Sequence, residues 1–149
     1  MLLWFSAISC GLIAGLYFAF STFIMTALAR IGEAQGVAAM NSINSTILSS
    51  LFMPLFFGTT IAGVALAVLA LGRAGRSAHA RWRRDLRHRH VSVTVVFNVP
   101  LNNELARADP ADADTAAIWA RYLKDWTFWN HVQTIASTSA SALFIAALS

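Results

Sequence analysis

Residues 1–29 read MLLWFSAISCGLIAGLYFAFSTFIMTALA and contain no charged side chain. The intervals 34–72 and 126–149 are also uncharged, if His131 is taken as neutral. A helix that crosses the hydrocarbon core of a bilayer needs about 20 consecutive apolar residues, and each interval is longer than that. No basic segment precedes the first helix, so we expect it to be retained rather than cleaved as a signal peptide. The sequence therefore predicts membrane spans over about residues 2–28, 51–71 and 125–148.

The composition indicates a single membrane domain that covers the whole chain. Of the 149 residues, 57% are hydrophobic and 12% are charged, whereas soluble domains average about 25% charged residues. Seven of the eleven basic residues are arginines between Arg73 and Arg89, which is one loop and not a distributed surface. Beside membrane spans, such a loop marks the cytoplasmic side. We therefore expect the lipid bilayer as a partner, and no binding to nucleic acid.

The stretch after the basic loop decides the topology. Its uncharged part, residues 91–103, rises about 20 Å as a helix and is short for a core of ~30 Å. Extended to about residue 106, it becomes a fourth span that separates the basic loop (73–90) from an outer acidic loop (107–124). We therefore predict an all-α, up-and-down four-helix bundle. It would be a multi-pass protein of the plasma (inner) membrane, with both termini in the cytoplasm.

Two local features shape this predicted bundle. Apolar residues recur every three or four positions over 33–50, which predicts an amphipathic helix that continues into the second span, with a kink at Pro54. Gly11 and Gly15 lie four residues apart in the first span. Small residues at this spacing let a neighbouring helix approach closely in lipid.

Few polar side chains fall inside the predicted spans. Asn98 and Asn102 lie four residues apart on one face of the third helix, and Pro100 between them frees a backbone carbonyl one turn back. In the last span His131 is ionisable, and Thr134 continues its face. Polar residues in a span usually face the bundle interior and mark a function. Hydrogen bonding between helices is the alternative for both sets.

Trp126 and Trp129 stand at the start of the last span. Tryptophans at this place most often form an aromatic belt at the membrane interface. A stacking wall for a flat aromatic ligand beside His131 is the second interpretation. The sequence leaves both open.

The chain contains the segments GLYFAFSTF (15–23), QGVAAMNSIN (35–44), FMPLFFG (52–58), VVFNVPLNN (95–103) and WTFWNH (126–131). These five segments resemble the anthrone oxygenase-like family of small membrane proteins. The resemblance covers nearly the whole chain except residues 72–90, where the family usually has an apolar start to the third span and this chain is rich in arginine. It implies a four-span bundle and, for some fungal relatives, oxidation of an anthrone to an anthraquinone with O₂, a monooxygenase reaction.

By position, the resemblance implies a shared set of polar residues. The candidate catalytic residues are Asn98, Asn102, Asn130 and His131. The candidate substrate contacts are Phe97, Trp126, Trp129 and Thr134.

Three functions stay open on the sequence alone. In an oxygenase without flavin or nicotinamide, His131 would remove a proton from a lipophilic aromatic substrate while Asn98 or Asn102 hydrogen-bonds the enolate oxygen. In a haem or copper protein, His131 would be an axial ligand, with a second ligand supplied by an oligomer. The third is a non-enzymatic membrane subunit or lipophile-binding protein, as a homo-oligomer or in a larger complex. No phosphate-binding glycine loop, serine triad or zinc-binding motif is present, which argues against hydrolases and nucleotide-driven pumps.

Overall fold

The computed structural model describes residues 1–73, 94–109, 112 and 114–148, and every regular element within these ranges is helical. The predicted all-α class is confirmed for this part of the chain. The predicted basic loop (73–90) and the start of the predicted third span lie almost entirely outside the described residues.

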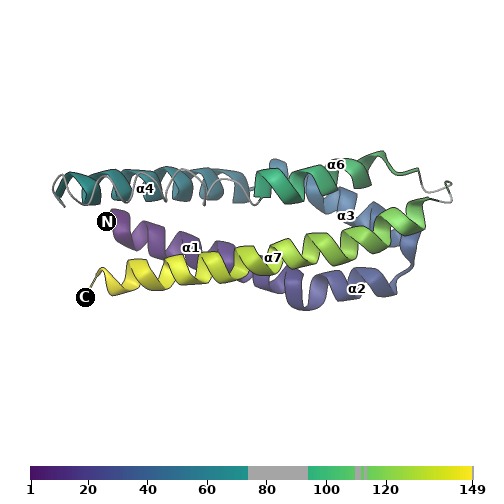
Figure 1. The fold of residues 1–149 in the computed structure, drawn as a ribbon, viewed down its shortest axis with the longest axis horizontal. Coiled ribbons are helices and arrows are strands. Elements are labelled where there is room, and N and C mark those ends of the chain that lie inside the picture. The colour runs from purple at the N-terminus through teal and green to yellow at the C-terminus, as the bar shows by residue number, and fades with distance from the viewer. Residues whose placement is uncertain (74–93, 110–111, 113, 149) are drawn as a thin grey trace.

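The first helical segment is continuous from Leu2 to Arg30 without being a uniform α-helix. α1 (Leu2–Ala19) passes into a π turn, η1 (Phe20–Ile24), and then into α2 (Met25–Arg30). Gly32 follows with a φ of 92° and lets the chain reverse, because this left-handed conformation strains residues that carry a Cβ. α3 (Glu33–Leu48) then packs against α2 (Figure 1).

The second apolar segment consists of two helices. α4 (Phe52–Arg73) follows α3 after a break at residues 49–51, where the helix axes bend by 58°. The backbone N–H of Phe52 donates to the Ser50 hydroxyl over 3.1 Å, so Ser50 caps the start of α4. Pro54 falls in the first turn of α4, where a backbone N–H has no intrahelical partner to lose. The predicted kink at Pro54 is therefore wrong, and the bend lies at residues 49–51.

The remaining described helices are η3, α6 and α7. A second π turn, η3 (Thr94–Asn98), leads into α6 (Val99–Arg107), where Pro100 is the second residue and again breaks no α-helical hydrogen bond. α7 (Thr115–Ala146) is a single helix of 32 residues. It begins well before the predicted start of the last span at residue 125.

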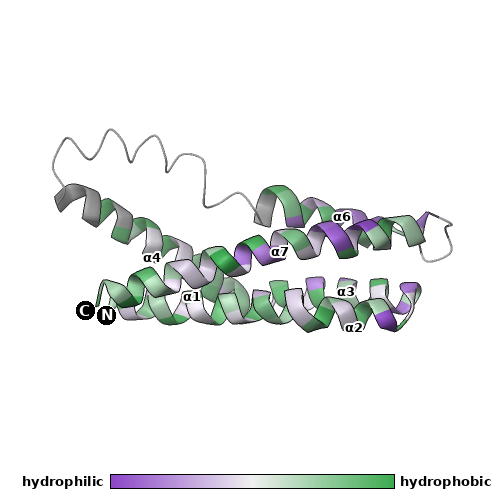
Figure 2. Cartoon of the chain, turned by 60° about the horizontal axis from the view of Figure 1, so that its bottom comes forward, coloured by the Kyte–Doolittle hydropathy of each residue, from purple (hydrophilic) through white to green (hydrophobic). Residues whose placement is uncertain are grey.

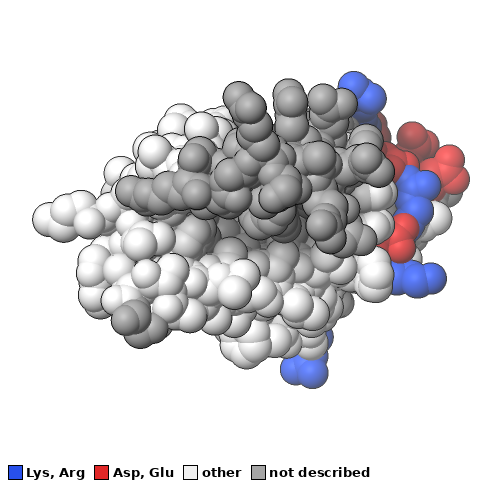
Figure 3. All heavy atoms as spheres, turned by 60° about the vertical axis from the view of Figure 1, so that its left-hand side comes forward, with Lys and Arg blue, Asp and Glu red and all other residues white. Residues whose placement is uncertain are grey.

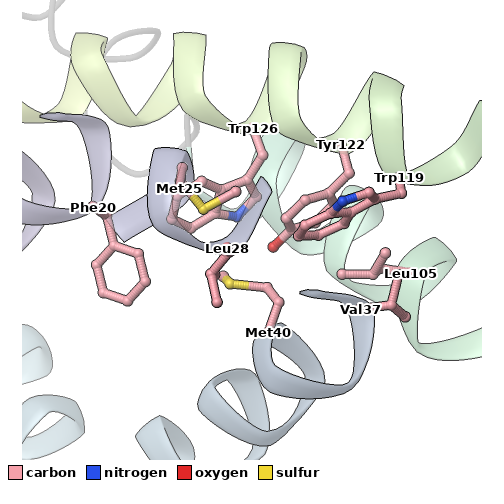
Figure 4. Packing of buried hydrophobic residues seen from close by; sticks show 9 residues of the cluster. All are labelled: Phe20, Met25, Leu28, Val37, Met40, Leu105, Trp119, Tyr122 and Trp126. Carbon is pink, nitrogen blue, oxygen red and sulfur yellow. The ribbon is translucent and has the colours of Figure 1, made fainter. Parts of the chain in front are cut away.

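The long helices α1 and α7 form the most extensive helix pair, and they run antiparallel so that both chain termini lie at one end (Figure 1). α4 packs on α1 near these termini. At the other end, α2, α3, α6 and the first half of α7 enclose a hydrophobic cluster (Figure 4). Its buried members are Phe20, Met25, Leu28, Val37, Met40, Leu105, Trp119, Tyr122 and Trp126.

Charged and apolar residues are segregated along the molecule. α1 and α4 are mostly apolar, and hydrophilic residues concentrate towards the end formed by α2, α6 and the start of α7 (Figure 2). The visible Lys, Arg, Asp and Glu side chains of the described residues gather at that same end (Figure 3). Within the described ranges, Leu2–Arg30 is long and apolar enough to cross a membrane. The bent pair Glu33–Leu48 and Phe52–Leu66 adds a second candidate if the two helices together form one span.

Candidate functional site

A line of buried polar side chains runs along the inner face of α7. Asn130 is 0% exposed, and its Nδ2 donates two hydrogen bonds to the first helical segment: one to the carbonyl oxygen of Tyr17 over 2.8 Å and one to the Ser21 hydroxyl over 2.9 Å. One turn further on, Gln133 Nε2 donates to Asn98 Oδ1 over 3.4 Å. α7 is therefore joined by hydrogen bonds to α1 and η1 on one side and to η3 on the other.

Both side chains that accept hydrogen bonds from this line lie in π turns. Ser21 belongs to η1 and Asn98 to η3, and both side chains are buried. A π turn shifts the backbone hydrogen-bond register by one residue and so changes which side chains face inward; such turns are frequent at functional sites. The Tyr17 carbonyl, just before η1, accepts the bond from Asn130. The two irregular turns thus present polar groups to α7.

A second polar group surrounds Tyr122, closer to the charged end. The Tyr122 hydroxyl is buried and donates to Asn102 Oδ1 over 2.7 Å. Burial raises the pKa of the Tyr122 phenol, an effect that the neighbouring Asn44 side chain partly offsets. Tyr122 therefore stays neutral and remains a donor. Its ring stacks between Trp119 and Trp126, with centroids 5.8 Å away on either side (Figure 4).

The predicted aromatic substrate contacts pack against the protein's own side chains. Phe97 and Trp129 stack on each other with centroids 3.7 Å apart and planes 10° apart. Trp126 is 7% exposed and packs edge-on against Phe20. A flat ligand thus has no room between Phe97 and Trp129 in this conformation, although the Phe97 side chain is 36% exposed.

His131 lies on the other side of α7 from Gln133. Its side chain is exposed, and consecutive positions around an α-helix differ by about 100°, so the residue after the buried Asn130 points elsewhere. His131 shares its face with Thr138, seven residues or two turns further on, and Thr134 lies one turn away near the same line. The structure therefore does not bring His131 together with Asn98 or Asn102.

A shallow open groove of about 480 Å³ lies between α1 and α7 on this side. Its lining is apolar apart from three hydroxyls, and comprises Gly11, Ala14, Gly15, Phe18, Thr134, Thr138, Ser141, Ala142 and Ile145. The Thr134 hydroxyl donates to the carbonyl of Asn130, and the Ser141 hydroxyl donates to the carbonyl of Ala7. Within the described part of the chain, Thr138 makes no such bond, so its hydroxyl is the one available to an occupant.

The two glycines of α1 differ in what faces them. A Cβ on Gly11 would lie 3.5 Å from Ser141 Oγ, which is ordinary contact, whereas a Cβ on Gly15 would meet nothing within 4 Å. Close helix packing thus involves Gly11 but does not require a glycine at position 15. The space over Gly15 belongs to the groove.

Residues 50–143, well over half of the chain, match the family model of the anthrone oxygenases. The chain belongs to the anthrone oxygenase family. No curated protein and no solved structure matches it significantly. Family membership and the apolar helix Leu2–Arg30 together indicate association with a membrane.

The part that matches the anthrone oxygenases contains every residue predicted from the sequence for the site, together with Gln133 and Tyr122. Sequence reasoning missed these two. Gln133, like His131, is a polar residue inside an apolar helix, so the sequence does not distinguish the two. Only its position one turn from the buried Asn130 indicates that Gln133 faces inward. Tyr122 lies before the predicted span, among residues with an ordinary surface pattern. In the described ranges no three His, Cys, Asp or Glu side chains come together as a metal-binding group.

Proposed function

We propose that this member of the anthrone oxygenase family oxidises a lipophilic aromatic or phenolic substrate with O₂, using no flavin or nicotinamide. The observation that carries the proposal is the match to the family over residues 50–143, which includes His131 and the groove residues Thr134, Thr138, Ser141 and Ala142. The groove adds a place for the substrate.

The chemistry needs a base and little else. An anthrone has a CH₂ group opposite its carbonyl, and loss of one proton gives an aromatic enolate. This electron-rich anion reduces O₂ and forms a C–O bond, and protonation gives a hydroperoxide. Loss of the second C–H proton with cleavage of the O–O bond then yields the second carbonyl and water. Overall, CH₂ and O₂ become C=O and H₂O.

His131 is the proposed base, and the groove is the proposed substrate site. Histidine is suited to general-base catalysis near neutral pH. His131 and Thr138 lie on one face of α7 about 10 Å apart along its axis, so a tricyclic substrate can span from the imidazole to the Thr138 hydroxyl. The hydroxyl would hydrogen-bond the enolate oxygen. Thr134, Phe97 and Trp129 remain secondary candidates for contact with substrate, whereas Trp126 is buried in the hydrophobic cluster.

Asn98, Asn102 and Asn130 take a positioning role in this proposal. Each hydrogen-bonds a group of the protein itself: Gln133, Tyr122, and the Tyr17–Ser21 turn, respectively. They would fix the rotation of α7 and so the direction of His131.

A multi-pass membrane topology is part of this proposal. We propose a four-helix bundle in the plasma membrane with both termini in the cytoplasm. The segregation of described charges to one end of the molecule supports it (Figure 3), as does the run of seven arginines between Arg73 and Arg89 in the sequence. The groove would then open sideways into lipid, which gives a lipophilic substrate a route that avoids water.

Blocking the groove tests the location of the reaction. With the purified protein in phosphatidylcholine vesicles and anthrone as substrate, we expect Gly15→Leu to lower kcat/KM at least tenfold, because the new side chain fills the space above Gly15. Gly63→Leu is the matched control on α4, since a Cβ there also meets nothing within 4 Å. Thr138→Val should lower kcat/KM by about tenfold, the equivalent of one hydrogen bond, while Ser139→Val, an exposed neighbour on another face, should not.

Equal activity of Gly15→Leu and the wild type would remove the groove as the substrate site. Saturable binding of anthrone without turnover would instead favour a lipophile-binding protein over an enzyme.

A further inference from the structure

The hydroxyls that line the groove between α1 and α7 differ in what they can still bond. A hydroxyl has one hydrogen to donate and two lone pairs that accept. Ser141 donates its hydrogen to the Ala7 carbonyl over 2.8 Å, and Thr134 donates its own to the Asn130 carbonyl over 2.9 Å. Both side chains line the groove and are half-buried. Towards an occupant their oxygens can therefore act only as acceptors, which is the opposite of the role proposed for Thr138.

Ser141 is the acceptor whose position is fixed by both helices of the groove. Its bond to Ala7 crosses from α7 to α1, whereas the bond of Thr134 returns to its own helix one turn back, as is common for threonine. Gly11 also lines the groove, and a Cβ there would lie 3.5 Å from Ser141 Oγ. The lack of a side chain at position 11 thus leaves this side of the Ser141 oxygen uncovered.

An acceptor in this groove favours a particular kind of ligand. The lining is apolar apart from its hydroxyls, so a charged donor such as an ammonium group would have to give up its hydration on entering. A phenol instead offers an O–H on a neutral, apolar ring. The oxygen of a ketone, quinone or ether only accepts, so it gains no hydrogen bond from Ser141.

We propose that Ser141 is a specificity-determining residue, which selects groove ligands that carry a phenolic O–H over the same ring system without a donor. The ligand's O–H donates to Ser141 Oγ, while the Ser141 hydrogen stays on the Ala7 carbonyl. The inference rests on the proposed function in taking the groove as the substrate site, and it narrows the substrate class from aromatic compounds in general to phenols.

The test compares two tricyclic probes, 2-hydroxyanthracene and 2-methoxyanthracene. Saturable binding to the protein in phosphatidylcholine vesicles is measured after subtraction of protein-free vesicles. Neither probe has a CH₂ group opposite a carbonyl, so binding is observed without the proposed oxidation. We expect Ser141→Ala to raise the Kd of 2-hydroxyanthracene about fivefold, the equivalent of one hydrogen bond, and not to raise that of 2-methoxyanthracene. Ser139→Ala is the matched control, because Ser139 is exposed on α7 and is not part of the lining.

Gly11→Ala tests the same contact with Ser141 still present. The added methyl group lies beside Ser141 Oγ at an ordinary contact distance, so the bond to Ala7 can remain. Alanine is also the better helix former, so the variant should fold. It should weaken binding of 2-hydroxyanthracene more than that of 2-methoxyanthracene. Gly63→Ala, whose Cβ meets nothing within 4 Å on α4, should leave both Kd values unchanged.

The outcomes separate this inference from the proposed oxidation. Equal weakening of both probes by Ser141→Ala would indicate looser packing of α1 on α7 and would overturn the inference. An unchanged Kd for 2-hydroxyanthracene in Ser141→Ala, or no saturable binding to the wild type, would overturn it as well. If the wild type consumes O₂ with anthrone while Ser141→Ala keeps its affinity, the selection by Ser141 fails alone. A selective loss in a protein that consumes no O₂ supports the selection and removes only the oxidation.

Discussion

The contact between Asn130 and Ser21 joins α7 to the π turn of the first helical segment, and its removal should weaken the fold by a predictable amount. Hydrogen bonds between helices contribute about 0.6 kcal/mol on average in a membrane protein, with a maximum near 1.7. Asn130→Ala removes two bonds, to Tyr17 and Ser21, and leaves space in a fully buried position. We therefore expect a loss of about 2 kcal/mol in the free energy of unfolding.

The single variant Ser21→Ala is harder to interpret, because alanine also favours the helix by up to about 0.5 kcal/mol over serine. A double-mutant cycle cancels this propensity term and isolates the pair. We expect a coupling free energy of about 0.6 kcal/mol between the two positions. The assay is reversible unfolding by sodium dodecyl sulfate in mixed micelles, followed by circular dichroism at 222 nm.

Thr22→Ala is the matched control for Ser21→Ala. Thr22 is exposed and its hydroxyl donates only to the carbonyl of Phe18 in its own helix. It should show no coupling to Asn130→Ala. If Ser21→Ala and Asn130→Ala prove additive within error, the contact between α1 and α7 does not have the geometry described.

Three further predictions test separate parts of the structure by the same unfolding assay. Gly36→Ala should lower the free energy of unfolding by about 1–3 kcal/mol, because a Cβ would lie 2.7 Å from Trp119 Cζ2 and 2.9 Å from the Leu28 carbonyl oxygen. In Gly63→Ala the new Cβ meets nothing within 4 Å, so this variant should be more stable by up to about 1 kcal/mol. Equal effects at the two sites would contradict the tight packing of α2 on α3. Tyr122→Phe should cost about 1 kcal/mol for the bond to Asn102. Burial raises the folded-state pKa of Tyr122 above its unfolded value of about 10, so the wild type should lose stability as the pH rises above 10. This loss should be smaller in Tyr122→Phe. If the wild type and Tyr122→Phe have the same pH profile, the result would argue against a buried phenol. Arg121→Ala should lower the free energy of unfolding by less than about 1 kcal/mol, because the ion pair of Arg121 with Glu104 joins side chains that are 51% and 40% exposed. A larger loss would mean that lipid or a partner shields this pair from solvent.

Much of the architecture follows from residue patterns that need no tertiary information. The absence of charge over residues 1–29 predicts the first long helix. The polarity of Asn98 within apolar surroundings predicts that it faces inward, and its side chain is indeed buried. Hydrogen bonding between helices, one of the two interpretations open for Asn98, is what the structure shows through Gln133. These features depend only on the cost of placing polar groups in an apolar environment.

The rotation of the helices is the part that the sequence does not supply. Asn130 and His131 are adjacent in the chain, yet one is fully buried and the other exposed, because α7 turns by about 100° between them. The π turns at Ser21 and Asn98 further change which side chains of their helices face inward, and no residue pattern in the sequence predicts these turns. The bend at residues 49–51 was likewise missed, since Pro54 is compatible with the first turn of a straight helix.

Oxygen consumption with anthrone tests the central claim most directly. The rate is measured for the wild type and for His131→Ala at equal protein in phosphatidylcholine vesicles, after subtraction of the protein-free rate, with circular dichroism to confirm that the variant is folded. Loss of a general base typically costs 10²–10⁴-fold, so we expect the folded His131→Ala variant to consume O₂ at about one hundredth of the wild-type rate or less. Equal rates in the two proteins would contradict His131 as the base, and no wild-type rate above the protein-free background would contradict the proposed oxidation itself.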